Sequence, residues 1–257
     1  MEYRPLGATG IDVSVLGLGT VKLGRDSGVD YARPFRLPTL REARHLIDKA
    51  HSLGINLIDT APAYGSSEER LGELLAGQRQ RWVIVTKVGE EFDGARSSHD
   101  FSPEHTTMSV HRSLRRLGTD YLDAVLIHSD GNDETILNEL GTLDCLKQLR
   151  DSGLIRAAGI SHKSPDGARA ALAQRADVIT ATLNPKDTSE AEVIMQAREQ
   201  GCGVLVKKAL EGGRETPQAL RFAVRHPGVS SVVVGTLNPE HLETNAGMVA
   251  GGKRKRQ

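Results

Sequence analysis

Eight short apolar runs, each followed by a segment with helical spacing of apolar residues, predict an α/β fold for this chain. Strands that alternate with helices pair in parallel through right-handed crossovers. Eight such units in 257 residues match a closed (β/α)₈ TIM barrel, which fills about 250 residues as one unit. A short β-hairpin is expected before the first strand.

The elements are predicted in chain order. The first strand covers 15–19, and a long loop, 20–38, separates it from a helix over 40–53. The later strands are predicted at 55–59, 83–86, 122–127, 155–160, 178–182, 203–206 and 231–234. The later helices are predicted at 66–75, 102–117, 134–151, from 164 onward, at 189–199, at 216–225 and from 238 onward. Ser102-Pro103 and Ser164-Pro165 are start signals, because a Ser cap precedes a Pro at the first helical position.

A doubly wound open sheet is the rival architecture, but it would not require eight units. The stretch Gly17-Leu18-Gly19 also lacks the third glycine, and the helix directly after it, of a dinucleotide-binding loop. We therefore expect residues 1–249 to form one barrel domain, followed by a basic, disordered tail at 250–257.

Composition excludes several function classes. Lys and Arg total 33 and Asp and Glu total 33, so the chain has no net charge to attract nucleic acid or an anionic membrane. No apolar run approaches the roughly 20 residues that span a bilayer, and no signal peptide is visible. Cys145 and Cys202 form neither a disulfide framework nor a close metal-ligand pair. We expect a cytoplasmic protein with no metal, no nucleic-acid partner and no membrane partner; its oligomeric state stays open.

Ionisable side chains follow three neighbouring predicted strands. Asp59, Lys87 and His128 end the second, third and fourth strands, and Tyr64 lies five residues after Asp59. In a barrel, the carboxyl ends of adjacent strands converge on one open face. Each residue has an ordinary structural explanation: a turn, a packed ring, a solvent-reaching amine or a satisfied imidazole. Their joint placement favours one shared catalytic pocket.

These four side chains suit proton transfer to an oxygen atom. A phenol titrates near 10, so Tyr64 needs a nearby cation to release its proton, and Lys87 could supply it. A lysine in the barrel mouth needs a counter-ion, for which Asp59 is available. His128 could orient a carbonyl oxygen or share its proton with Tyr64. Reduction of a carbonyl by a hydride donor needs such a group.

Several stretches resemble the aldo-keto reductase family, in its bacterial type with a short C-terminus. Residues 3–10 (YRPLGATG) and 16–20 (LGLGT) look like the family's opening, and 56–65 (NLIDTAPAYG) resembles its Asp/Tyr signature. The segments 85–87, 126–128 and 229–245 are similar to later family segments. The resemblance covers essentially the whole chain. It implies NAD(P)H-dependent reduction of an aldehyde or ketone, with Tyr64 as general acid.

The resemblance also implies NADPH as cofactor, with NADH as the alternative. The implied contacts are Gly19, Thr20, Ser161, His162, Thr180, Lys207, Lys208, Gly235, Thr236, Asn238, His241 and Asn245. The chain departs from the family pattern where His162 stands for Asn, Thr180 for Gln and Lys207 for a stacking aromatic ring. His241 replaces an Arg that pairs with the 2′-phosphate, and NADPH preference is therefore the family default.

Three functions stay open. The first is a carbonyl reductase that acts on a small-molecule substrate. The second is a catalytically weak nucleotide-binding sensor or partner protein with the same fold. The third is an unrelated barrel lyase or isomerase in which Lys87 forms a Schiff base.

Overall fold

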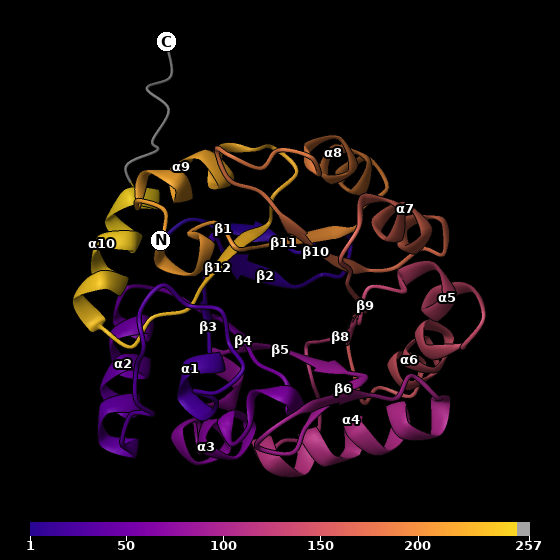
Figure 1. Cartoon of the computed structure of the whole chain (residues 1–257), viewed down its shortest axis with the longest axis horizontal. Helices are drawn as coiled ribbons and strands as arrows, with labels where there is room; N and C mark the ends of the chain where they lie inside the picture. Colours follow the sequence, from indigo (N-terminus) through magenta and orange to yellow (C-terminus); the bar gives the residue numbers. More distant parts are fainter. Residues whose placement is uncertain (251–257) are drawn as a thin grey trace.

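The structure, a computed structural model that describes residues 1–250, is a closed barrel of parallel strands surrounded by helices (Figure 1). The barrel strands are β3 (Leu16–Gly19), β4 (Leu57–Asp59), β5 (Val83–Val88), β8 (Ala124–His128), β9 (Ala158–Ser161), β10 (Val178–Thr182), β11 (Gly203–Lys207) and β12 (Ser231–Val234). They pair in the order β10-β11-β12-β3-β4-β5-β8-β9, and the ring closes between β9 and β10. The predicted (β/α)₈ barrel is confirmed.

Helices follow the strands and form the outer ring in Figure 1. They are α1 (Val21–Gly24), α2 (Leu40–Ser52), α3 (Ser67–Leu74), α4 (Pro103–Leu117), α5 (Asp133–Asn138), α6 (Thr142–Asp151), α7 (Pro165–Ala173), α8 (Ala191–Glu199), α9 (Gln218–Arg225) and α10 (Pro239–Ala250). Short 3₁₀ turns are η1 (Pro62–Tyr64), η2 (Arg79–Arg81) and η3 (Glu211–Gly213). Ser102 caps α4 by accepting a hydrogen bond from the His105 amide, as the Ser-Pro signal predicts.

Three segments differ from the sequence prediction. The helix expected over 134–151 is two helices, α5 and α6, because Gly141 between them adopts φ +70°. The loop after β3 contains α1, and the loop after β5 contains a hairpin of β6 (Glu90–Phe92) and β7 (Ser97–His99). Of the predicted tail, 251–257 lie outside the described residues.

The core has two layers, because successive strand residues point to opposite faces. In β5, Ile84 packs outward against the helices, whereas Val83 and Val85 point into the barrel. The predicted N-terminal hairpin, β1 (Tyr3–Pro5) and β2 (Asp12–Ser14), crosses the middle of the ring in Figure 1. Its neighbouring residue Leu6 and its own Val13 join the interior layer, so the hairpin closes one end of the barrel.

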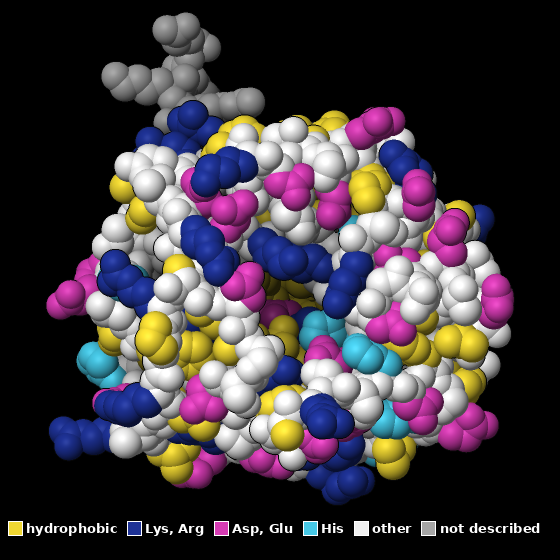
Figure 2. All heavy atoms as spheres, in the orientation of Figure 1, with side chains coloured by type: hydrophobic (Ala, Val, Ile, Leu, Met, Phe, Trp, Pro, Cys, Tyr) yellow, Lys and Arg dark blue, Asp and Glu magenta, His cyan; other side chains and the backbone are white. Residues whose placement is uncertain are grey.

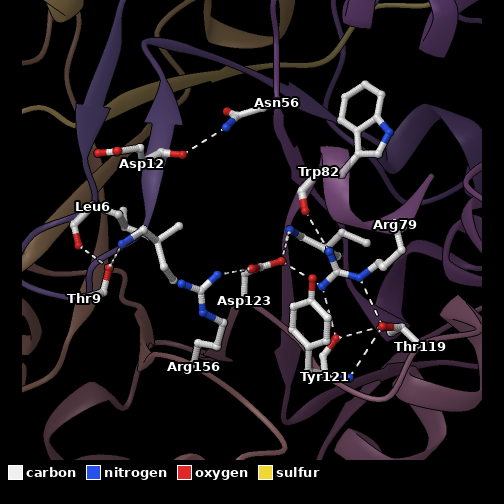
Figure 3. Close-up of polar contacts among 12 residues, drawn as sticks. Leu6, Thr9, Asp12, Asn56, Arg79, Trp82, Thr119, Tyr121, Asp123 and Arg156 are labelled. Carbon is white, nitrogen blue, oxygen red and sulfur yellow. Dashed lines mark hydrogen bonds and ion pairs between the residues drawn. The ribbon is translucent and has the colours of Figure 1, made fainter.

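Asp123, directly before β8, anchors the ends at which the strands begin. The buried Asp123 carboxylate accepts hydrogen bonds from Arg79 (2.7 Å), Arg156 (3.0 Å) and the Ile84 amide (2.9 Å) (Figure 3). The hairpin is tied to the same end region, since Arg4 donates to the carbonyls of Val224 and Val229. These contacts stabilise the closed end and leave the opposite end for chemistry.

Within residues 1–250, no helix is both long and apolar enough to cross a membrane. The same part of the chain holds no cluster of three or more His, Cys, Asp or Glu side chains suited to a metal ion.

Candidate active site

A cavity of about 290 Å³ lies at the carboxyl ends of the barrel strands. Figure 2 shows a hollow in the middle of the molecule, with Lys or Arg and His side chains around it. The lining includes the four predicted catalytic residues and five of the predicted cofactor contacts: Asp59, Tyr64, Lys87 and His128, then Ser161, His162, Thr180, Lys207 and Lys208. The strand-end argument from the sequence places the first four in one pocket, and the five residues implied by the family resemblance line the same cavity.

Lys87 and Asp59 form a buried ion pair on neighbouring strands. Lys87 Nζ donates to Asp59 Oδ1 at 2.7 Å and to the Thr60 carbonyl oxygen at 2.8 Å. The Lys87 side chain is only 4% exposed, so both hydrogen bonds are shielded from water. The pair holds the ammonium group in one place at the cavity wall.

Tyr64 ends the 3₁₀ turn η1, and the glycine after it fixes the turn. Gly65 has φ +60°, and a Cβ at this position would lie 2.2 Å from the Gly24 carbonyl oxygen. Lys87 Nζ lies 4.8 Å from the centre of the Tyr64 ring. Burial, followed by the negative charges of Asp59 and Glu90, raises the pKa of Tyr64 well above its ordinary value. The phenol is therefore protonated at neutral pH and can donate.

His128 ends β8 and meets Tyr64 edge to face. The two ring centres are 6.1 Å apart at an interplanar angle of 85°. His128 Nδ1 lies 2.7 Å from Glu90 Oε2 on the β6 strand. Burial lowers the pKa of His128; Glu90 acts to raise it, and the charges of Lys87 and Lys207 add to the lowering. Because the pKa is lowered, the His128 imidazole is uncharged at neutral pH.

The opposite wall carries three positions at which the sequence departs from the pattern it resembles, Thr180, His162 and Lys207. Thr180 donates to Ser161 Oγ at 3.0 Å, and Lys207 Nζ donates to the His162 carbonyl oxygen at 2.5 Å. His162 is fully buried, and its Nε2 lies 2.7 Å from Glu190 Oε2. Burial lowers the pKa of Lys207 to about 8, so its positive charge is less persistent than that of a surface lysine.

The remaining predicted cofactor contacts do not line the cavity. Gly19 ends β3, and Thr20 is buried with its hydroxyl donating to the Asp59 carbonyl oxygen at 2.9 Å. The other five follow β12. Asn238 caps α10 by accepting a hydrogen bond from the Glu240 amide at 2.8 Å, and Gly235 and Thr236 come just before it. His241 and Asn245 lie on α10 itself. His241 is exposed and Asn245 is buried.

Sequence reasoning did not identify three charged residues around the site. Glu90 contacts His128, Glu190 contacts His162, and the buried Arg25 lies 3.5 Å from Glu90 Oε1. Glu90 follows Lys87 by three residues, which is the only sequence signal for it. Glu190 and Arg25 carry no spacing signal, because only the fold brings them to their partners.

Comparisons with known proteins agree with this architecture. A model described as the Aldo/keto reductase family matches residues 15–218. An uncharacterized oxidoreductase of Bacillus subtilis is 32% identical over 65% of this chain, and the match spans 50% of that relative's length. An NADH-specific methylglyoxal reductase of Escherichia coli is 34% identical over 83% of this chain and 68% of that protein. The crystal structure of a putative aldo-keto reductase from Pseudomonas aeruginosa is 49% identical, with a TM-score of 0.89 over 97% of this chain and 95% of that one.

Proposed function

Because the chain belongs to the aldo/keto reductase family, we propose that it reduces an aldehyde or ketone to an alcohol with NAD(P)H, using Tyr64 as the general acid. The observation that carries this proposal is the meeting of Tyr64, Lys87 and His128 at one cavity. The oxidoreductase names of the relatives support the reaction class.

Tyr64 is suited to protonate the oxygen of a reduced carbonyl. Its raised pKa keeps the hydroxyl protonated until the substrate takes the proton. As the proton leaves, negative charge develops on the phenol oxygen, and the Lys87 ammonium group stabilises that charge. Asp59 and the Thr60 carbonyl oxygen keep Lys87 in position for this role.

The same ion pair argues against the lyase or isomerase reading. A lysine that attacks a carbonyl to form an imine must be uncharged. The Lys87 nitrogen instead donates hydrogen bonds to the Asp59 carboxylate and the Thr60 carbonyl oxygen, and these two acceptors hold it in place.

The cavity wall offers polar groups that support a place for the nicotinamide end of the cofactor. Ser161 and Thr180 supply hydroxyl groups, and among the described residues the buried Nδ1 of His162 has no hydrogen-bond partner. We assign these three residues to the nicotinamide ring and its amide. When bound, the cofactor supplies the hydride.

The adenosine end is assigned to the start of α10. Its backbone N–H groups, with Thr236 and Asn238 beside them, offer a phosphate site. We propose NADPH as the cofactor, and a comparison of the Kd values for NADPH and NADH tests this choice. The imidazole of His241 binds a 2′-phosphate less strongly than a guanidinium would, and one relative is named NADH-specific.

The test is Tyr64→Phe, with Tyr121→Phe as a matched control that removes a hydroxyl at the closed end of the barrel. Methylglyoxal, the substrate named for the E. coli relative, is the first aldehyde to assay. We expect Tyr64→Phe to lower kcat at least about 100-fold while the Kd for the nucleotide stays unchanged. Binding is followed by the fluorescence of the nucleotide and not by that of Trp82. Trp82 precedes the start of β5, at the end of the barrel away from the cavity.

Turnover of Tyr64→Phe equal to that of Tyr121→Phe would overturn the assignment of the acid. If the unmodified protein binds the nucleotide but reduces no carbonyl in a panel of aldehydes and ketones, the sensor reading replaces the reductase.

A further inference from the structure

A carboxylate that the proposed mechanism does not use lies against His128. Glu90 Oε2 is 2.7 Å from His128 Nδ1, although the angle falls outside hydrogen-bond geometry. A carboxylate oxygen only accepts hydrogen bonds, and an unprotonated ring nitrogen also only accepts. Two acceptors at this distance repel each other, so Nδ1 must carry a proton.

Glu90 is held in place from two sides. Its other oxygen, Oε1, accepts from Ser97 Oγ at 2.6 Å and lies 3.5 Å from Arg25 Nη1. Arg25 is itself fixed, since Nη1 donates to the Ala63 carbonyl oxygen at 2.9 Å. Burial acts to raise the pKa of Glu90, but His128, Ser97 and Arg25 together lower it to about 2. The carboxylate is thus ionised at neutral pH and has no proton to donate.

We propose that Glu90 is a positioning residue that holds the His128 imidazole in the tautomer protonated on Nδ1, so that Nε2 is a hydrogen-bond acceptor for the cavity. Nδ1 is buried against Glu90 while His128 lines the cavity, and Nε2 is the nitrogen left for a ligand. The consequence for catalysis rests on the proposed function; the tautomer itself does not.

This tautomer decides between the two roles that the sequence leaves open for His128. A neutral ring without a proton on Nε2 cannot donate to a carbonyl oxygen. With no carbonyl bound, it accepts a hydrogen bond from the Tyr64 hydroxyl, and after reduction it accepts one from the product alcohol. When a carbonyl is bound, the single hydroxyl proton of Tyr64 points to the carbonyl oxygen, so Tyr64 is the donor.

Four groups on four elements face His128: Glu90 on β6, Lys87 on β5, Lys207 on β11 and Tyr64 on η1. Glu90 favours the imidazolium form, and the two lysines disfavour it. Removal of the Glu90 charge therefore moves the titration of His128 to lower pH and frees the ring to exchange tautomers.

The experiment compares Glu90→Gln with Glu91→Gln. Glu91 lies on the same short strand and contacts His105 and Arg112, neither of which lines the cavity, so it is a matched control. Side-chain ¹⁵N NMR of the protein without added ligand reports which nitrogen of His128 is protonated, with the signal assigned by its loss in His128→Asn. Steady-state reduction of methylglyoxal is measured over a pH range in parallel, and circular dichroism checks the fold.

We expect the Nδ1-protonated form in the unmodified protein and in Glu91→Gln, and a mixture of tautomers in Glu90→Gln. We expect Glu90→Gln to lower kcat about 10- to 100-fold, as loss of an outer-shell partner does, with KM within about twofold. Glu90→Asp should restore part of the Nδ1-protonated population. A proton on Nε2 in the unmodified protein, or the same tautomer in both Gln variants, overturns the proposal. The expected NMR result in a protein without reductase activity supports the positioning role and rejects the proposed function alone.

Discussion

Lys87→Met tests the buried ion pair through protein stability, without reference to catalysis. The substitution keeps the length of the side chain but removes both Nζ hydrogen bonds and leaves the Asp59 carboxylate without its cation. Removing one partner of a buried pair costs about 3–5 kcal/mol, because an uncompensated charge stays in the interior. For a chain of this size, about 2–4 °C of Tm per kcal/mol gives a fall of about 10 °C.

Lys147→Met is the control, since the pair of Lys147 with Asp144 is exposed and is worth about 1 kcal/mol at most. Urea unfolding and calorimetry measure both variants, and Asp59→Asn/Lys87→Met should recover part of the loss because it removes the stranded charge. The reasoning is refuted if Lys87→Met unfolds at the same urea concentration as Lys147→Met, or if the double variant is no more stable than Lys87→Met.

Three further changes have defined outcomes. Gly159→Ala should cost about 3 kcal/mol in urea unfolding, because the new Cβ would lie 1.8 Å from the Val178 carbonyl oxygen; an unchanged midpoint contradicts the close approach of β9 to β10. Gly247→Ala, inside α10 with open space around it, should instead gain about 0.5–1 kcal/mol by the same assay, and a loss would argue against a helical Gly247. The pKa of Glu90 lies at about 2 in the folded chain against an ordinary 4.5, so its stabilisation is present above pH 4.5 and lost as the pH falls toward 2. Between pH 5 and 2, the free energy of unfolding of Glu90→Gln should therefore fall less than that of the unmodified protein. An equal dependence of this free energy on pH in both proteins would show that the Glu90 carboxylate does not stabilise the fold.

The sequence predicts the barrel well because the signals are local. Each strand is a short apolar run, and the cap at Ser102 depends on residues within one helical turn. The single predicted helix over 134–151 is wrong because Gly141 has φ +70°, and periodicity alone does not show this backbone conformation. The sequence also does not predict the β6–β7 hairpin, because both strands are short and lack a strong apolar alternation.

The site residues that end barrel strands can be predicted from the sequence. Lys87 requires a counter-ion, and parallel pairing of β4 with β5 places Asp59 beside it at 2.7 Å. Glu90 is 38 residues from His128, and their contact depends on how the hairpin folds over the end of β8. Charge alone does not show such a partner, because most glutamates of this chain lie on its surface.

The closed end of the barrel can form only late in the synthesis of the chain. Arg4 binds carbonyl groups 220 and 225 positions further along, and Ser230 donates to the Pro5 carbonyl oxygen. A nascent chain emerging from the ribosome cannot complete these contacts until Ser230 has been added, 225 residues after Pro5. The hairpin residues Leu6 and Val13 must therefore wait for β12 to emerge before the barrel interior in which they pack is closed.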